Sequence, residues 1–167
     1  LEYGWRQVKL YFMIGLPTET DEDLKAIADL CRKVRDAAGK GNPRLQVTAA
    51  LSPFVPKPFT PFQWVEQISQ EEIQRRVQVV RNEFKGQKFL KLRWHEPAMS
   101  HLEGILSRAD RRLADVVEKV YRKGGIFTSW IEGFDLAPWL EALEECGLTA
   151  DEFTRARSMD EYLPWEH

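Results

Sequence analysis

The chain has 167 residues, of which 43% are apolar and 30% are charged, so it can bury a hydrophobic core and form one or one and a half domains. Its formal net charge is −2, which argues against a surface dedicated to nucleic acid. It contains neither an apolar run long enough to span a membrane nor a signal-peptide pattern, so we expect a soluble cytoplasmic protein without membrane contact.

The amino-terminal part predicts a strand followed at once by a helix. Apolar residues alternate with polar or mixed ones from Val8 to Ile14, as in a strand with one buried face. The strand ends at Gly15-Leu16-Pro17, and Thr20 with Asp23 then forms a variant capping box that opens a helix. The segment 36–43, DAAGKGNP, is expected to stop that helix at Gly39 or Gly41.

A second strand, a stiff loop, a second helix and a third strand are expected next. The strand runs from Leu45 to Leu51 and is followed by the proline-rich loop 52–64, SPFVPKPFTPFQW. Ser69 with Glu72 is a further capping box, and the apolar stripe behind it predicts a helix. A third strand is expected over Phe89 to Trp94.

The rest of the chain has helical periodicity. Apolar positions follow helical spacing from Met99 to Lys123, with a break expected at 107–110. A short helix is expected between Asp135 and Gly147, and Thr149 with Glu152 predicts the cap of a last helix. The aromatic residues of this part are expected to hold a small helical core together: Trp130, Trp139, Phe153, Tyr162 and Trp165.

This order of elements predicts an α/β fold with parallel strands joined by crossovers. Because each of the two clearest strands has one apolar and one mixed face, they resemble a barrel wall more than an open sheet that is buried on both sides. The apolar face would lie under helices, and the mixed face would line a cavity. The side chains assigned to the cavity are Lys9, Tyr11, Met13, Gln46 and Thr48. Alternation alone leaves open which face points inward.

Two segments in this order resemble a known family. The turn MIGLPTETDEDL at 13–24 resembles the GLPGET-type turn that follows the fifth strand of radical S-adenosylmethionine (radical SAM) enzymes. The segment ALSPFVPKPFTPFQW at 50–64 is similar to the loop that ends the sixth strand in such enzymes. Together with LSRADRRL and the closing YLPWEH, they make the chain resemble the carboxy-terminal half of an uncharacterised radical SAM family whose larger members carry a cobalamin-binding-like region upstream.

The resemblance implies a fold and a set of binding residues. Residues 1–97 would be the C-terminal part of a partial (β/α) TIM-type barrel, and 98–167 a helical C-terminal module. The positions that match the cofactor-binding surface of the family are Met13, Ile14, Gly15, Glu19, Leu51 and Ser52. Backbone and apolar contacts at these positions would support the adenine, whereas Glu19 is expected to hold the turn and the helix together. Thr18 stands where many relatives have glycine.

The motifs that hold the cluster are expected outside this chain. Radical SAM chemistry needs three cysteines, usually CxxxCxxC, to bind a [4Fe–4S] cluster, and the chain has only Cys31 and Cys146. We therefore expect a C-terminal fragment of a radical SAM iron–sulfur oxidoreductase, with no catalytic or metal-binding residue of its own. Its main partner would be the missing N-terminal part of the same polypeptide, and the full-length protein would need S-adenosylmethionine, a [4Fe–4S] cluster and, as an open question, cobalamin.

Other readings remain open. The segment after residue 97 is alternatively a docking module for a protein or an RNA, and its balanced charges favour a protein. An unpaired edge strand gives the fragment a reason to self-associate. A stand-alone domain without a site is a third reading, and the sequence does not identify the substrate.

Several other polar groups allow more than one interpretation. His95, Glu96 and His101 miss the HExxH spacing of a zinc site, so we expect ordinary polar residues. Lys57 is expected to face solvent, an aromatic ring or an anionic substrate. The cluster at 108–112 is either a salt-bridged helix junction or a patch that contacts phosphate or RNA.

Overall fold

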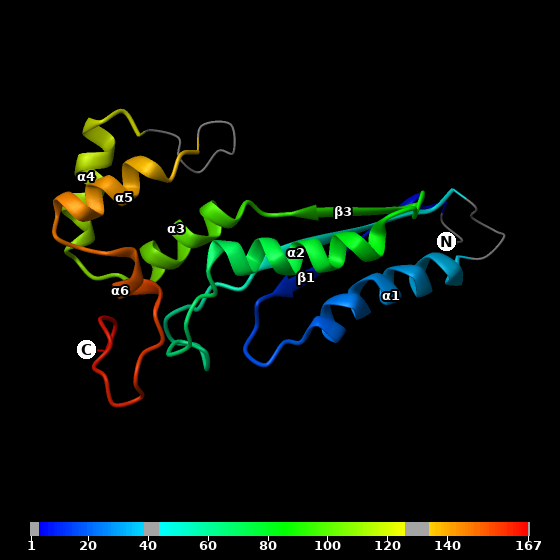
Figure 1. The fold of residues 1–167 in the computed structure, drawn as a ribbon, viewed down its shortest axis with the longest axis horizontal. Helices are drawn as coiled ribbons and strands as arrows, with labels where there is room; N and C mark the ends of the chain where they lie inside the picture. The colour runs from blue at the N-terminus through cyan, green and yellow to red at the C-terminus, as the bar shows by residue number, and fades with distance from the viewer. Residues whose placement is uncertain (1–3, 39–43, 126–133, 167) are drawn as a thin grey trace. The chain divides into compact units, whose positions relative to one another are not determined.

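The computed structural model of the chain describes residues 4–38, 44–125 and 134–166 (Figure 1). Its elements, in chain order, are β1 (Gln7–Ile14), α1 (Asp21–Ala37), β2 (Gln46–Pro53), α2 (Gln70–Phe84), β3 (Leu90–Trp94), α3 (Pro97–Arg108), α4 (Leu113–Arg122), α5 (Ala137–Glu145) and α6 (Ala150–Thr154). The chain divides into two compact units. The first comprises Leu1–Phe54 and Ile68–His95, and the second comprises Val55–Gln67 and Glu96–His167.

The first unit is an α/β sandwich of one sheet and two helices. All three strands are parallel and lie in the order β1-β2-β3, so the three strand predictions and the parallel arrangement are confirmed. The strands form an open sheet and do not close into a barrel within the described residues. The register places Lys9 beside Thr48 and Thr48 beside Lys91, which fixes the residues that share each face.

Helices α1 and α2 cover one face of this sheet and run alongside its strands (Figure 1). The core between helices and sheet contains Ile14, Leu24, Ile27, Ala28, Cys31, Val47, Ala49, Leu51, Ile73, Val77, Val80 and Leu90. The apolar members of each strand therefore point toward the helices, as the alternation predicts. On the opposite face, Tyr11 and Met13 are 76% and 56% exposed.

The helix caps agree with the sequence in part. Thr20 and Asp23 form a complete capping box at the start of α1. Ser69 accepts a hydrogen bond from the backbone of Glu72, but the Glu72 carboxylate turns away from the cap to bind two arginines of α2. The expected box at Ser69 is therefore only half formed, because a charged partner outcompetes a backbone amide. The predicted stop of α1 at Gly39 or Gly41 lies outside the described residues.

The second unit packs α3 to α6 around its own core. The break expected in the long helical segment falls between α3 and α4, at 109–112. Trp139 and Phe153 belong to the core, whereas Tyr162 is exposed and Trp130 lies outside the described residues. The loop 55–67 belongs to this unit, and its Gln67 side chain donates to the Ser100 carbonyl. No helix in the described ranges is long and apolar enough to cross a membrane.

Candidate functional site

The turn that follows β1 requires glycine at position 15. Gly15 is buried and has a φ of +87°, in the left-handed region that side chains disfavour. A Cβ atom there would lie 2.5 Å from Cδ1 of Ile68, so the space that a side chain would need is already filled. The sharp change from strand to helix in this motif therefore has a steric cause.

Glu19 fastens this turn to the second helix. Its Oε2 accepts a hydrogen bond from the Gly15 amide at 2.7 Å and an ion-paired hydrogen bond from Arg76 at 2.5 Å. The side chains of Glu19 and Arg76 are only 9% and 14% exposed, so the pair is well shielded from water. Glu19 thus positions the backbone of the turn, because the same oxygen accepts from the Gly15 amide and from Arg76.

A wider network of charges extends this link. Arg76 also binds Glu72, and Arg75 binds both Glu72 and Asp21 of the first turn of α1. Hydrogen bonds from Arg75 are the main cause that lowers the pKa of Glu72 to about 2. The network joins the start of α1 to the start of α2 and so holds these two helix ends together at the carboxyl edge of the sheet.

Thr18 is strained within the same turn. Its φ is +69°, which is a rare conformation for a β-branched residue. Glycine would adopt this conformation freely. Threonine at this position therefore has a direct conformational cost. Such strain persists only where the surrounding contacts hold the backbone in place.

The strands bring the two predicted site segments together at one edge of the sheet. Met13 lies directly beside Ser52, and Ile14 lies beside Pro53. Ile14 and Leu51 are fully buried against the helices, so their side chains are not available to a ligand. Their carbonyl groups accept hydrogen bonds from Phe54 and His95, respectively. Met13 and the partly exposed Ser52 are the candidate side chains that face outward.

We use the term open face for the side of the sheet opposite α1 and α2. Its members are Gln7, Lys9, Tyr11 and Met13 of β1, Gln46, Thr48, Ala50 and Ser52 of β2, and Lys91 and Arg93 of β3. His95 follows β3, and its amide donates to the Leu51 carbonyl, which continues the ladder to a place beside Ser52. Members of β1 and β2 were expected on this face, whereas those of β3 were not, although Leu90, Leu92 and Trp94 alternate with them.

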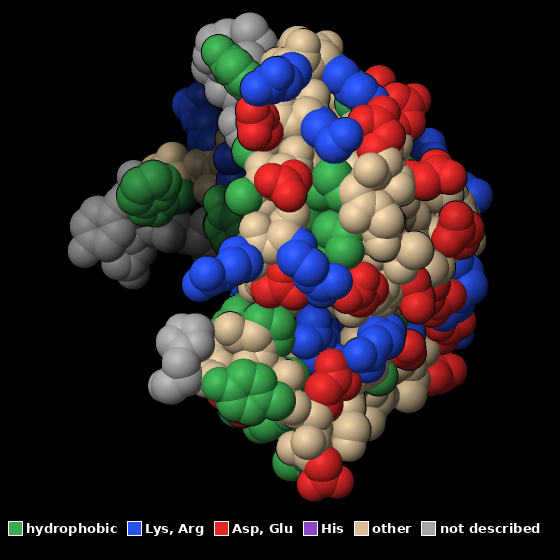
Figure 2. Space-filling model, turned by 90° about the vertical axis from the view of Figure 1, so that its left-hand side faces the viewer, with side chains coloured by type: hydrophobic (Ala, Val, Ile, Leu, Met, Phe, Trp, Pro, Cys, Tyr) green, Lys and Arg blue, Asp and Glu red, His purple; other side chains and the backbone are tan. Residues whose placement is uncertain are grey.

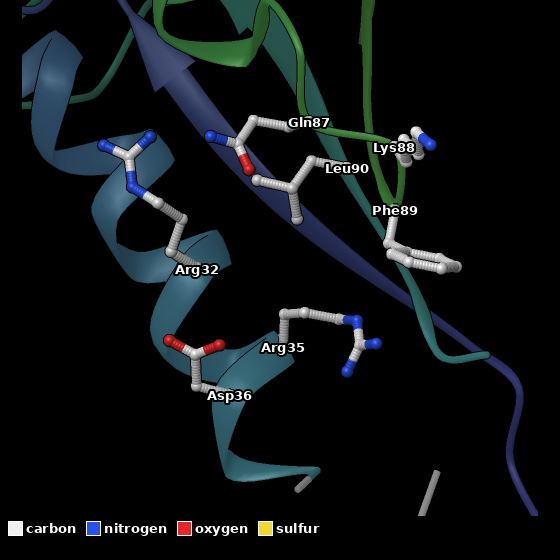
Figure 3. Close-up of a pocket in the computed structure, with 7 residues that line it drawn as sticks. All are labelled: Arg32, Arg35, Asp36, Gln87, Lys88, Phe89 and Leu90. Carbon is white, nitrogen blue, oxygen red and sulfur yellow. The ribbon is translucent and has the colours of Figure 1, made fainter. Parts of the chain in front are cut away.

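A small pocket of about 170 Å³ lies at the other end of the same sheet (Figure 3). It is lined by Arg32, Arg35, Asp36, Gln87, Lys88, Phe89 and Leu90. Arg32 is paired with Asp29, and Arg35 lies 4.8 Å from the centre of the Phe89 ring. Because Leu90 begins β3, the pocket is at the amino ends of the parallel strands, away from the Gly15 turn. The pocket is therefore separate from the predicted site.

Several charged groups of the second unit form internal pairs. Arg112 binds Asp110 and Glu152, which confirms a salt-bridged junction for that part of the 108–112 cluster. Lys57 binds Glu103 at 2.5 Å and does not face solvent alone. Figure 2 shows Lys and Arg side chains interspersed with Asp and Glu side chains over the face that it displays. No charge of one sign dominates that face.

Arg108 differs from its neighbours in the cluster. It is fully buried and donates to the carbonyl groups of Val65, Thr154 and Arg155, without a carboxylate partner among the described residues. Burial lowers its pKa to about 10. Arg108 therefore takes no part in the expected salt-bridged junction, because its guanidinium instead joins segments far apart in the sequence.

Comparison with known proteins assigns no function. No family model matches the chain, and no solved structure matches it. A segment of 62 residues is 42% identical to a curated protein of Methanocaldococcus jannaschii named "Uncharacterized protein MJ0966". That segment covers 37% of this chain and 13% of the archaeal protein, so the matched region is a small part of its relative.

Proposed function

We propose that this chain forms part of the cofactor and substrate cavity of a radical S-adenosylmethionine enzyme. In this proposal, β1, β2 and β3 are the last strands of a partial (β/α) barrel, and the open face lines the cavity. The observation that carries the proposal is the meeting of the two motif-bearing segments at one carboxyl edge, where Met13 lies beside Ser52. Ligands of parallel α/β folds bind at that edge.

The edges of the sheet are consistent with a larger barrel. β1 pairs with β2 on one side only, and no other described strand pairs with its second edge. An exposed edge presents unpaired backbone N–H and C=O groups, and another strand can cover it by pairing with them. We propose that strands from the N-terminal part of the same polypeptide supply that cover, with β1 as the point of attachment.

The described residues fit the nucleoside part of the cofactor and not its cluster. Met13 offers an exposed apolar side chain, and Ser52 offers a hydroxyl group next to it. Gly15 and Glu19 act indirectly, because their mutual hydrogen bond fixes the backbone on which Met13 is held. Cys31 is buried in the core of the first unit, and the described residues contain no group of His, Cys, Asp or Glu suited to a metal. The cluster ligands would lie elsewhere in the polypeptide. The cluster, together with S-adenosylmethionine, would supply the radical chemistry. Whether cobalamin also takes part is an open question.

The first test is the iron content of two proteins. The natural polypeptide that carries this chain should contain CxxxCxxC within about 200 residues upstream, a span typical of one domain. After anaerobic reconstitution it should show the absorbance of a [4Fe–4S] cluster, whereas the 167-residue chain alone should bind no iron. A natural polypeptide that has neither the cysteines nor a cluster would refute the proposal.

The second test is cofactor affinity. Met13→Ala in the natural polypeptide should weaken S-adenosylmethionine binding by about fivefold, since it removes roughly 1 kcal/mol of apolar contact. Leu30→Ala is the matched control, because Leu30 is also an exposed apolar residue but lies on α1. Equal losses in both variants would show that Met13 does not contact the cofactor.

A docking role for the second unit is the alternative function. Val117 and Tyr121 of α4 are exposed one helical turn apart, which gives the unit an apolar strip. Lys119 and Lys123 beside them are paired with Glu145 of α5, so the surroundings favour a protein over an RNA. Fluorescence anisotropy with labelled RNA should therefore show no salt-dependent binding. Tight, salt-sensitive binding would favour the RNA reading.

A further inference from the structure

Among the residues that the structure describes, the open face carries three cationic side chains and no acidic one. Lys9 comes from β1, and Lys91 and Arg93 come from β3. The register places Thr48 between Lys9 and Lys91, and it places Ala50 between Tyr11 and Arg93. Neighbouring strands are about 4.8 Å apart, so the backbones at the two lysines are separated by roughly 10 Å. Two lysine side chains can converge on one small anion across that distance.

These cations differ from three arginines on the helices of the same unit. Arg32, Arg75 and Arg76 each bind a carboxylate on the helical side. No carboxylate within the described residues forms an ion pair with Lys9, Lys91 or Arg93. Like charges gathered on one surface repel each other, so an arrangement of this kind is stabilised when an anion binds.

The residues between the cations complete a recognition surface. Thr48 is only 9% exposed and brings a hydroxyl group to the floor between the two lysines. Ala50 of β2 lies between Tyr11 and Arg93, and its small side chain leaves space between them. An arginine guanidinium and a hydroxyl group are donors suited to carboxylate and phosphate oxygens.

We propose that this part of the open face binds the carboxylate or phosphate group of an anionic substrate. The inference rests on the proposed function, since it names the substrate class for the same cavity. The cationic group is distinct from the nucleoside position, because Lys9 and Met13 are four residues apart on β1, or roughly 13 Å. Cofactor and substrate can therefore occupy different ends of the face.

The test is an NMR titration of the chain with inorganic phosphate and, separately, with succinate. Sodium chloride at matched ionic strength serves as the baseline for general charge screening. We expect saturable shifts in the backbone amides of Thr48, Ala50, Lys91 and Arg93. A response to both anions indicates that carboxylates suffice, whereas a response to phosphate alone restricts the substrate to phosphorylated compounds.

Charge-matched variants locate the site. Lys91→Gln and Arg93→Gln should each weaken binding about fivefold or more, and both positions are exposed, so the fold should persist. Arg81→Gln removes one exposed cation from α2 and should leave binding unchanged. Equal weakening by Arg81→Gln, shifts confined to the first turns of α1 and α2, or no saturation with either anion would overturn the inference.

The inference and the proposed function fail in different ways. Met13→Ala should alter S-adenosylmethionine binding in the natural polypeptide and leave phosphate binding to the chain unchanged. If the chain binds no anion but the natural polypeptide binds S-adenosylmethionine, only the proposal of an anionic substrate fails. If the natural polypeptide has no cluster and the chain still binds anions, the anion site stands and the radical SAM proposal fails.

Discussion

Alanine at position 15 tests the steric account of the turn. In the wild-type chain the Gly15 amide binds Glu19, and its Cα faces the side chain of Ile68. A methyl group would therefore meet two obstacles, an unfavourable backbone conformation and an occupied space. Gly86 offers a matched control, because its φ is +77° and no heavy atom lies within 4 Å of the position of its Cβ.

The two obstacles have separable magnitudes. Placing alanine in the left-handed region costs about 1–2 kcal/mol, and this cost applies at both glycines. At Gly15 the new Cβ would also lie 2.5 Å from Cδ1 and 3.0 Å from Cγ1 of Ile68. Overpacking of this kind costs about 1–3 kcal/mol, although the far end of the isoleucine can shift. Gly15→Ala should therefore destabilise the chain by about 2–5 kcal/mol, against about 1–2 kcal/mol for Gly86→Ala.

Urea unfolding followed by circular dichroism measures both free energies. Ile68→Ala in the Gly15→Ala background should recover the packing part of the loss, so a double-mutant cycle should give a favourable coupling of about 1 kcal/mol or more. The reasoning is refuted if Gly15→Ala and Gly86→Ala have the same effect, or if the cycle shows no coupling. Either result would mean that Ile68 does not fill the space beneath the turn.

Further predictions concern the turn, its charge network and the second unit. Thr18→Gly should raise the free energy of unfolding by about 0.5–1 kcal/mol, because it relieves the φ of +69°; thermal denaturation checks the sign. The pKa of Glu72 in the folded chain lies below its usual value of 4.5. The ionised carboxylate therefore stabilises the fold above pH 4.5, and this stabilisation is lost as the pH falls toward 2. The stability gap between wild type and Glu72→Gln, measured by urea unfolding, should therefore close over that range, and a constant gap would contradict the network. Arg108→Met should cost about 3 kcal/mol or more, since it leaves the carbonyl groups of Val65 and Arg155 without their donor and the Thr154 carbonyl with the Gln67 amide alone; a change below 1 kcal/mol in urea unfolding would refute this role.

The alternation of residue types predicts the strands of the first unit and their parallel pairing, but not the open sheet that they form. The strands at Val8 and Leu45, and the shorter one before Trp94, follow a period of two, and parallel pairing follows from the helices between them. The same alternation puts Ile14 and Leu51 on the apolar face, which the structure shows to lie against the helices. Their place in the candidate site therefore depends on their backbone and on the resemblance, and not on their side chains.

Contacts between distant segments could not be predicted from the sequence. Arg108 and Arg112 belong to the same charged stretch of sequence. Arg108 is nevertheless buried, whereas Arg112 forms exposed ion pairs. The difference arises because carbonyl groups near Val65 and Thr154 converge on Arg108. Likewise, the strain at Thr18 depends on a turn conformation that residue type alone does not specify.

Hydrogen exchange of the natural polypeptide, with and without S-adenosylmethionine, tests the central claim most directly. The account predicts that the cofactor slows amide exchange in peptides covering 11–19 and 50–54, where the two motif-bearing segments meet. A reconstituted polypeptide that binds the cofactor and shows protection only outside these segments would contradict the account, as would a polypeptide that does not bind it at all.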